Sequence, residues 1–297
     1  MKYLSVAETA KRWKLSERTV RNYCANGRVD GAFITGKTWN IPETAEKPGR
    51  IIITKMPKNV LEQLKEEKRS GIKGGIYHKV QVDLTYNSNH IEGSRLTHDQ
   101  TRYIYETNTI GIEDIAVNVD DIVETANHFR CIDYIIDYAN KQLSEKMIKE
   151  LHSLLKSGTS DSRKSWFNVG DYKAFANEVG GNETTAPDKV SEEMKSLLKS
   201  YNSKSEKTLK ELLAFHVEFE KIHPFQDGNG RVGRLILFKE CLKNEIVPFI
   251  IDEDIKLYYY RGLKEWNNET GFLMDTCLAA QDKFKKYLDY FGIPYEK

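Results

Sequence analysis

Twelve consecutive residues say most about this chain: His223-Pro-Phe-Gln-Asp-Gly-Asn-Gly-Arg-Val-Gly-Arg234. Apolar side chains recur at steps of three and four over residues 204–222 and again over residues 231–243, which predicts a helix on each side. The Asp-Gly-Asn-Gly turn between them continues neither helix, and its glycines let backbone N–H groups face a ligand. Because the N-terminus of the second helix and two arginines follow directly, the stretch indicates chemistry on a phosphorylated substrate.

This stretch fits the pattern H-x-F-x-[DE]-G-N-G-R-x-x-R at every fixed position. It resembles the signature of the Fic family, whose members typically transfer AMP from ATP to protein hydroxyls. The resemblance covers roughly residues 80–288 and implies a mainly α fold, with an all-helical Fic core and a β-hairpin flap over residues 80–297. It implies a protein adenylyltransferase that uses ATP and Mg²⁺ and modifies an unidentified target protein, for which the chain itself is one candidate.

The resemblance also implies a role for each position of the motif. His223 would be the catalytic base, since imidazole takes up a proton near neutral pH. Asp227 would bind Mg²⁺, because this hard cation prefers carboxylate oxygen. Phe225 would hold the loop from the inside. The nucleotide phosphates would be bound by Gly228, Asn229, Gly230, Arg231 and Arg234, of which Arg231 and Arg234 also stabilise charge during catalysis and Arg234 holds the γ-phosphate.

Two further groups of residues resemble positions of the family. Glu124-Thr-Ala-Asn127 matches a helical E-x-x-N. Tyr259, Tyr260 and Asn267 resemble the contacts on the adenine side of the nucleotide. Without the resemblance, both tyrosines would be interpreted as core aromatics, so the adenine side depends on the family pattern alone.

The segment between residues 166 and 185 lacks a helical period and is rich in aromatic, β-branched and glycine residues, which predicts an extended hairpin. Val179, Gly180 and Gly181 lie where the family has its flap. In the family the flap holds a target segment in extended form by strand addition.

A short pattern N-terminal to the motif predicts that the activity is inhibited within the chain. Ser88-Asn-His-Ile-Glu92-Gly93 fits [ST]-x-x-x-E-[GN], and alone it would mean only that Ser88 and Glu92 are neighbours on a helix that Gly93 ends. Upstream of a full Fic motif it resembles the inhibitory helix, whose glutamate pairs with the last motif arginine, here Arg234. Glu92 would then deny Arg234 to the γ-phosphate. Whether Glu92 also orients a water for AMP removal stays open.

The first fifty residues are more basic than the rest, with ten Lys or Arg against five Asp or Glu, a net charge of +5. A capping box at Ser5–Glu8, two short helices and a hairpin predict a small winged helix-turn-helix domain over residues 1–50, followed by a linker helix over residues 51–79. The segment resembles excisionase or MerR-like DNA-binding domains. Its candidate DNA contacts are Arg18, Thr19, Arg21 and Asn22, with Lys37 near phosphate. A docking module with solvated basic residues is the alternative.

Composition sets the remaining bounds. The chain has 297 residues, 39% hydrophobic and 30% charged, with a formal net charge of +1, as in a globular protein without a global nucleic-acid signature. It shows no membrane span and no apolar run of signal-peptide length. Its four cysteines lack paired spacing, which favours reduced thiols, and we expect a cytoplasmic homo-oligomer.

Two other functions remain open at this point. The chain could be a DNA-binding regulator whose Fic core only senses nucleotide, although intact His223 and Asp227 argue against this. It could also be a transferase that moves phosphocholine, UMP or phosphate, since the motif recognises phosphates and not bases. Tyr259, Tyr260 and Asn267 favour adenine.

Overall fold

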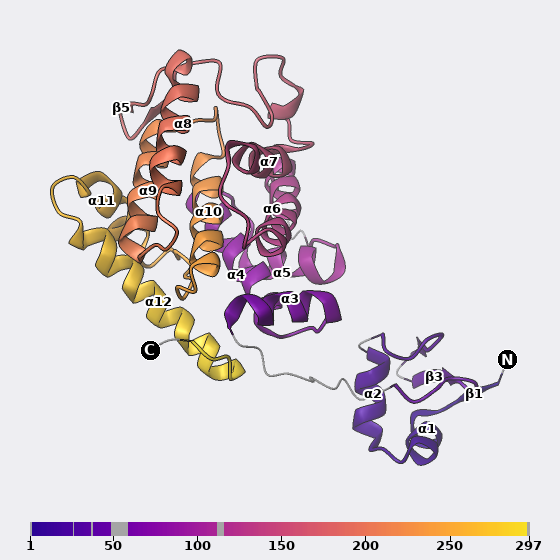
Figure 1. Ribbon diagram of the computed structural model, residues 1–297. Helices are drawn as coiled ribbons and strands as arrows, with labels where there is room; N and C mark the ends of the chain where they lie inside the picture. Colours follow the sequence, from indigo (N-terminus) through magenta and orange to yellow (C-terminus); the bar gives the residue numbers. More distant parts are fainter. Residues whose placement is uncertain (1, 26, 37, 49–58, 112–115, 296–297) are drawn as a thin grey trace. The chain divides into compact units, whose positions relative to one another are not determined.

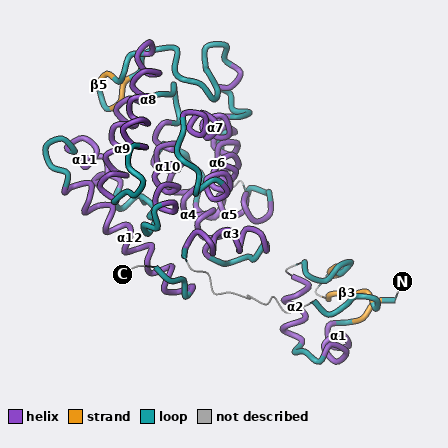
Figure 2. The backbone as a smooth tube through the Cα atoms, in the orientation of Figure 1, coloured by secondary structure: helices purple, strands orange, loops and turns teal. Residues whose placement is uncertain are grey.

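The computed structural model describes residues 2–25, 27–36, 38–48, 59–111 and 116–295. Contacts within the chain divide it into two compact units, Met1–Met56 and Pro57–Lys297. Helices make up most of the regular structure and the strands are short (Figure 2), which confirms the prediction of a mainly α chain. No helix in the described ranges is both long and apolar enough to cross a membrane.

The first unit combines two short helices with a three-stranded antiparallel sheet. Its elements are β1 (Tyr3–Leu4), α1 (Val6–Trp13), α2 (Glu17–Ala25), β2 (Phe33–Thr35) and β3 (Thr38–Pro42), and the sheet order is β1-β3-β2. Ser5 and Glu8 form the predicted capping box before α1. Val20, Cys24 and Ile41 lie in its small core. The predicted helix pair and hairpin are confirmed, whereas Lys37 lies outside the described residues.

The second unit is a helical bundle with one small hairpin (Figure 1). In chain order its elements are α3 (Val60–Ser70), α4 (Ile76–Ile91), α5 (His98–Thr107), α6 (Val119–Asp137), α7 (Glu145–Lys156), the 3-10 turn η1 (Asp161–Arg163), β4 (Glu178–Val179), β5 (Asn182–Glu183), α8 (Pro187–Asn202), α9 (Leu209–Ile222), α10 (Asn229–Lys243), α11 (Lys256–Glu265) and α12 (Gly271–Phe291).

Two boundaries differ from the prediction. The helix expected from residue 204 begins at Leu209, because Thr208 and Glu211 form a capping box that sets its N-terminus. The region predicted as a linker helix is divided: its first part lies outside the described residues, and α3 packs against α4 and α6 with Leu64 and Ile76 fully buried. These helices therefore belong to the core of the second unit.

Helix α10 lies at the centre of this unit. It packs against α9, α6, α7 and α4 (Figure 1), and from Arg231 to Leu242 every residue is buried. The sequence predicted one apolar side for this helix, but the structure buries residues on all of its sides. A charge taken out of water needs a partner, so Arg231 and Arg234 must be paired inside the protein. This requirement positions the site described below.

Helices α11 and α12 pack against each other, and at Gly262 there is no room for a side chain. A Cβ added there would lie 2.7 Å from Leu273 Cα and 2.8 Å from its backbone nitrogen, and backbone atoms cannot swing aside. We expect Gly262→Ala to destabilise the protein by about 1–3 kcal/mol, more than the roughly 1 kcal/mol that alanine gains over glycine in a helix. Urea unfolding measures the change. Gly111→Ala, where a Cβ meets no atom within 4 Å, is the control, and equal midpoints would contradict the prediction.

Candidate active site

The Fic motif begins where α9 ends. His223 adopts a left-handed backbone, φ 51°, and its N–H donates to the Phe219 carbonyl at 3.0 Å, which closes the helix. This conformation is uncommon outside glycine, although histidine tolerates it better than most residues. The Nδ1 atom of His223 lies 3.3 Å from the Glu220 carbonyl. A carbonyl only accepts, so Nδ1 carries the proton of the neutral ring and Nε2 is left as the basic nitrogen.

The electrostatic surroundings keep His223 in its basic form. Burial lowers its pKa, and the nearby Lys173 ammonium lowers it further, against the opposing effect of the Glu220 carbonyl. The imidazole is therefore neutral at the pH where a base is needed.

The turn after His223 is held rigidly from inside. Phe225 is fully buried and stacks on the His152 ring, with centroids 4.0 Å apart and planes at 4°. The side-chain oxygen of Asn229 accepts from the Phe225 N–H at 2.7 Å, and its amide nitrogen donates to the Phe225 carbonyl at 2.8 Å. Both amide atoms of Asn229 are thus bonded to the backbone of Phe225, so this side chain helps to hold the turn in shape.

The N-terminus of α10 is the place where the sequence predicts an anion site. Gly228 is its N-cap in a left-handed conformation, φ 82°, and the first N–H groups of a helix have no partner within it. A Cβ at Gly230 would collide with the Glu92 carboxylate, so the glycine is what allows that carboxylate to reach the helix end.

The structure brings Ser88, Glu92 and Arg234 together. Arg234 donates from Nη2 to Glu92 Oε1 at 2.6 Å and to the Ser88 carbonyl at 2.9 Å, and from Nε to Ser88 Oγ at 3.0 Å. Its side chain is only 5% exposed. Burial opposes the charge, but Glu92, Tyr259 and Glu220 together outweigh burial and raise the pKa of Arg234. Gly93, φ 96°, follows at the end of α4.

Arg231 and Asp227 belong to a second charged cluster. Arg231 pairs with Glu124, and its Nη2 lies 3.2 Å from Asp227 Oδ2. The Nζ atom of Lys156 lies 2.6 Å from the same Asp227 oxygen and 2.5 Å from Glu124 Oε1. Burial raises the pKa of Asp227, but Arg231 and Lys156 outweigh it and hold the pKa below its usual range. The sequence analysis missed Lys156, because a lysine in the last turn of a helix is typical of a solvated helix end.

Asp227 is the predicted Mg²⁺ ligand. Its side chain is 49% exposed, and among the described residues no group of three or more His, Cys, Asp or Glu is placed to hold a metal ion. Mg²⁺ is usually bound by one or two carboxylates together with substrate phosphates. A single accessible carboxylate at the mouth of the anion site therefore fits an ion that arrives with the nucleotide.

The three residues predicted on the adenine side do not act alike. Tyr259 is buried and its hydroxyl lies 2.6 Å from His216 Nε2, so in this structure it belongs to the core, and its contact with a nucleotide stays a prediction. Tyr260 is exposed, and desolvation of its hydroxyl, together with the nearby Glu92 carboxylate, raises its pKa against the effect of Arg234. Asn267 is exposed and accepts from Lys221 at 3.1 Å. Tyr260 and Asn267 thus remain accessible candidates.

The predicted flap is present but short. Val179 pairs with Asn182, and Gly180 and Gly181 make the turn with φ of 58° and 78°. Its base is fixed to the catalytic loop by Lys173, whose Nζ donates to Asn177 Oδ1 at 2.7 Å, Thr184 Oγ1 at 2.6 Å and the Ile222 carbonyl at 3.4 Å. Burial lowers the pKa of Lys173 to about 8. No motif marks this residue in the sequence.

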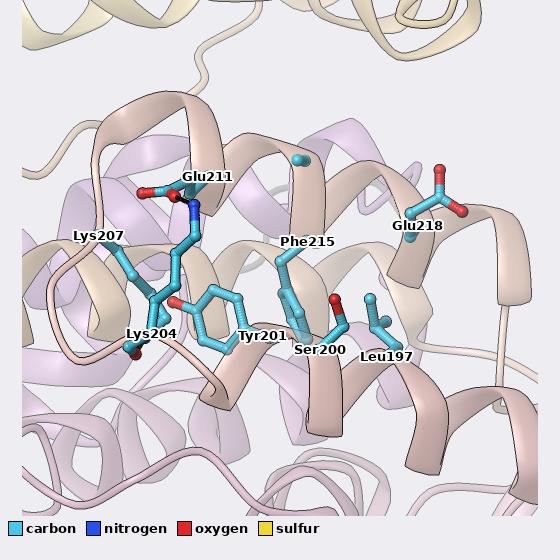
Figure 3. A pocket seen from close by; sticks show the side chains of 9 residues that line it. Leu197, Ser200, Tyr201, Lys204, Lys207, Glu211, Phe215 and Glu218 are labelled. Atoms are coloured by element: carbon cyan, nitrogen blue, oxygen red, sulfur yellow. Dashed lines mark hydrogen bonds and ion pairs between the residues drawn. The ribbon is translucent and has the colours of Figure 1, made fainter.

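A separate hollow of about 240 Å³ lies between α8 and α9 (Figure 3). Tyr201 and Phe215 form part of its lining, and Lys204 pairs with Glu211 beside it. None of its lining residues belongs to the Fic motif, so this hollow is distinct from the site.

Comparisons with known proteins agree with this geometry. The family model described as Fic/DOC family matches residues 142–240. The chain is 30% identical over 215 residues to the protein adenylyltransferase Fic of Drosophila melanogaster and, equally, to that of Drosophila simulans. The matched region is 69% of this chain and 41% of each relative, so the chain spans less than half the length of these relatives.

Solved structures share the fold. A Fic domain containing signaling protein from Bacteroides thetaiotaomicron has a TM-score of 0.61 and 22% identity, over 80% of this chain and 98% of the other. Fic-1 from C. elegans has a TM-score of 0.58 and 19% identity, over 77% of this chain and 69% of the other. Together with the family model and the relatives, these matches show that the chain contains a domain of the Fic/DOC family.

Proposed function

We propose that this protein is an adenylyltransferase that moves AMP from ATP to a hydroxyl side chain of a target protein. The proposal depends on one observation. A histidine whose Nε2 is the basic nitrogen directly precedes a turn that leads into the N-terminus of α10, and the first turns of α10 carry two buried arginines. In the reaction the target oxygen attacks the α-phosphorus, the bond from that phosphorus to the bridging oxygen breaks, and pyrophosphate leaves. His223 takes up the hydroxyl proton.

The triphosphate would bind to groups that the fold already orients. Backbone N–H groups of Asn229 and Gly230 face the α- and β-phosphates, Arg231 balances their charge, and Arg234 holds the γ-phosphate. Asp227 would hold Mg²⁺, which would supply positive charge to neutralise the phosphates. The protein then contributes mostly positioning and charge stabilisation.

Glu92 would hold the protein in an inhibited state. Its carboxylate pairs with the arginine that the γ-phosphate needs and lies against Gly230 at the anion site. A negative charge in this place both competes for Arg234 and repels the triphosphate. Activation therefore requires Glu92 to leave.

The target segment would bind along the flap. The β4–β5 hairpin has only two strands, so its outer edges can pair with an extended segment, and Val179 is 46% exposed beside the turn. Because Lys173 ties the flap to the loop before His223, a segment bound here would present its hydroxyl near the base.

Labelling with radioactive ATP tests the reaction type. The Glu92→Gly protein is incubated with Mg²⁺, a cell extract as the source of targets, and ATP labelled on either the α- or the γ-phosphate. Transfer of AMP labels protein with α-labelled ATP only, and mass spectrometry then finds one AMP per modified residue. Label from the γ-phosphate would identify a phosphotransferase, and labelling by UTP alone would identify a different donor.

The first unit supports a second proposal, weak binding of duplex DNA. Arg18, Arg21 and Asn22 are exposed on α2, with Thr19 half-buried between them, and the segment carries a net charge of +5 from ten basic and five acidic residues. A helix that exposes two arginines after a tight turn, in a basic segment, suits the major groove, and a hairpin follows it. The exposed face of α2 is where we expect the DNA to bind.

Arg18→Ala combined with Arg21→Ala is expected to weaken DNA binding of the full chain at low salt. For each phosphate that the variant no longer neutralises, the slope of log K against log salt should become shallower by about 0.9. Fluorescence anisotropy with a labelled duplex measures both quantities. Lys195→Ala with Lys199→Ala on the exposed face of α8 removes the same charge elsewhere. Equal weakening in both variants, or no binding at any salt, would favour a docking module.

A further inference from the structure

Lys156 is the last residue of α7 and has an unusual environment for a helix end. Its side chain is 3% exposed, and its Nζ lies 2.6 Å from Asp227 Oδ2, 2.5 Å from Glu124 Oε1 and 3.4 Å from Asp161 Oδ2. Three carboxylates thus surround one ammonium group, supplied by α6, by the turn after α7 and by the Fic motif.

The carboxylates need a cation in this place. Glu124 is only 12% exposed, and burying carboxylates close together without a positive charge is costly. Arg231 contributes one charge through Glu124 and Asp227. Lys156 contributes the second, and its Nζ is the nearer of the two cations to Asp227 Oδ2, at 2.6 Å against 3.2 Å for Arg231 Nη2.

We propose that Lys156 is a tethered cation that holds Asp227 in the nucleotide-free protein, so that the ammonium group and a divalent cation compete for this carboxylate. The inference rests on the proposed function in so far as Asp227 is the metal ligand there. Glu124 and Asp161 give the competition a physical basis, because Lys156 keeps both partners when it gives up Asp227. Divalent ions then bind weakly to the free protein and enter with the phosphates of the nucleotide.

A variant without the Lys156 ammonium tests whether this group competes with a divalent cation for Asp227. We expect Lys156→Met to bind Mn²⁺ at least about tenfold more tightly than the unmutated protein without nucleotide, because a positive charge close to the ion has gone. Titration calorimetry measures the affinity. A rise of the thermal unfolding midpoint with Mg²⁺, in the variant but not in the unmutated protein, is a second readout.

Three further variants test whether a gain in Mn²⁺ affinity comes from the Lys156 charge and from Asp227. Lys164→Met removes a lysine that binds the other oxygen of Asp161 at 2.6 Å but is 45% exposed, and should gain no affinity. Lys156→Arg keeps the charge and should gain none. Adding Asp227→Ala to Lys156→Met should abolish the gain. Equal Mn²⁺ affinity of Lys156→Met and the unmutated protein would overturn the proposal.

Loss of folding would also be informative. Lys156→Gln is a second neutral variant that can still donate to the carboxylates. If neither neutral variant folds in metal-free buffer, recovery by Mg²⁺ but not by Na⁺ of equal ionic strength supports the proposal, and failure of Mg²⁺ to restore either one contradicts it. No nucleotide is present in these measurements, so their outcome is separate from the identity of the transferred group.

Discussion

Replacing Glu92 by glycine is expected to raise the rate of transfer by about 30-fold to several thousand-fold. Removing one partner of a buried, hydrogen-bonded charge pair changes binding by roughly 2–5 kcal/mol, and each 1.4 kcal/mol is about tenfold. Glu92 is 32% exposed whereas Arg234 is 5% exposed, so solvent screens part of the interaction and the lower half of the range is the better expectation. The freed Arg234 then binds the γ-phosphate.

The measurement is the initial rate of labelling from α-labelled ATP at saturating ATP and target. Ser88→Ala is the matched control, since it removes the hydroxyl bond to Arg234 Nε but leaves the carboxylate in place. It should activate far less. Arg234→Ala should not mimic the activated protein, because it removes the γ-phosphate ligand together with the inhibitory contact. Equal rates for the unmutated protein and Glu92→Gly would show that the segment only ends a helix.

Local pattern was sufficient for much of the fold. The 3.6-residue period on both sides of the motif predicted α9 and α10, and glycine at 228 marked the turn whose left-handed backbone the structure contains. The Ser88–Gly93 pattern, taken with the motif, predicted which arginine Glu92 meets. The correct predictions have two sources. Some depend on residue spacing within one helix or turn, and the others depend on a residue pairing that the family pattern already implies.

What the sequence did not predict depends on distant residues. Lys156 and Asp227 are 71 positions apart, and the lysine meets Glu124 only because α6 and α7 pack together. A lysine in the last turn of a helix ordinarily points to solvent, so its charge pattern carried no sign of burial. Tyr259 is another such case, since no local pattern indicated that the packing of α11 places its hydroxyl against His216.

Removing the His223 side chain in the Glu92→Gly protein is expected to lower transfer by about 10²- to 10⁴-fold, the usual contribution of a general base. ATP should still bind, because the base touches the hydroxyl proton and not the phosphates. His223→Asn is the better variant beside His223→Ala, since asparagine tolerates the left-handed backbone that residue 223 adopts. The ATP affinity is measured by calorimetry and the transfer by labelling.

A matched control tests whether the loss of transfer is specific to His223. His98→Ala removes an exposed histidine of α5, outside the Fic motif, that contacts Asp83 at 2.9 Å, and its transfer rate should not change. Undiminished labelling in both His223 variants would mean that another group takes the proton. Loss of ATP affinity in both would mean that residue 223 shapes the phosphate site instead.

The pH profile gives an independent signature of the same residue. Burial lowers the pKa of His223, and a histidine is a base only above its pKa. The acid limb of kcat/KM should therefore fall at a pH below the ordinary value of about 6.5 for histidine. Lys173→Met removes the ammonium that lowers this pKa further, so it should move the acid limb toward higher pH. If the acid limb of kcat/KM falls at the same pH in Lys173→Met as in the unmutated protein, Lys173 acts only by holding the flap against the catalytic loop.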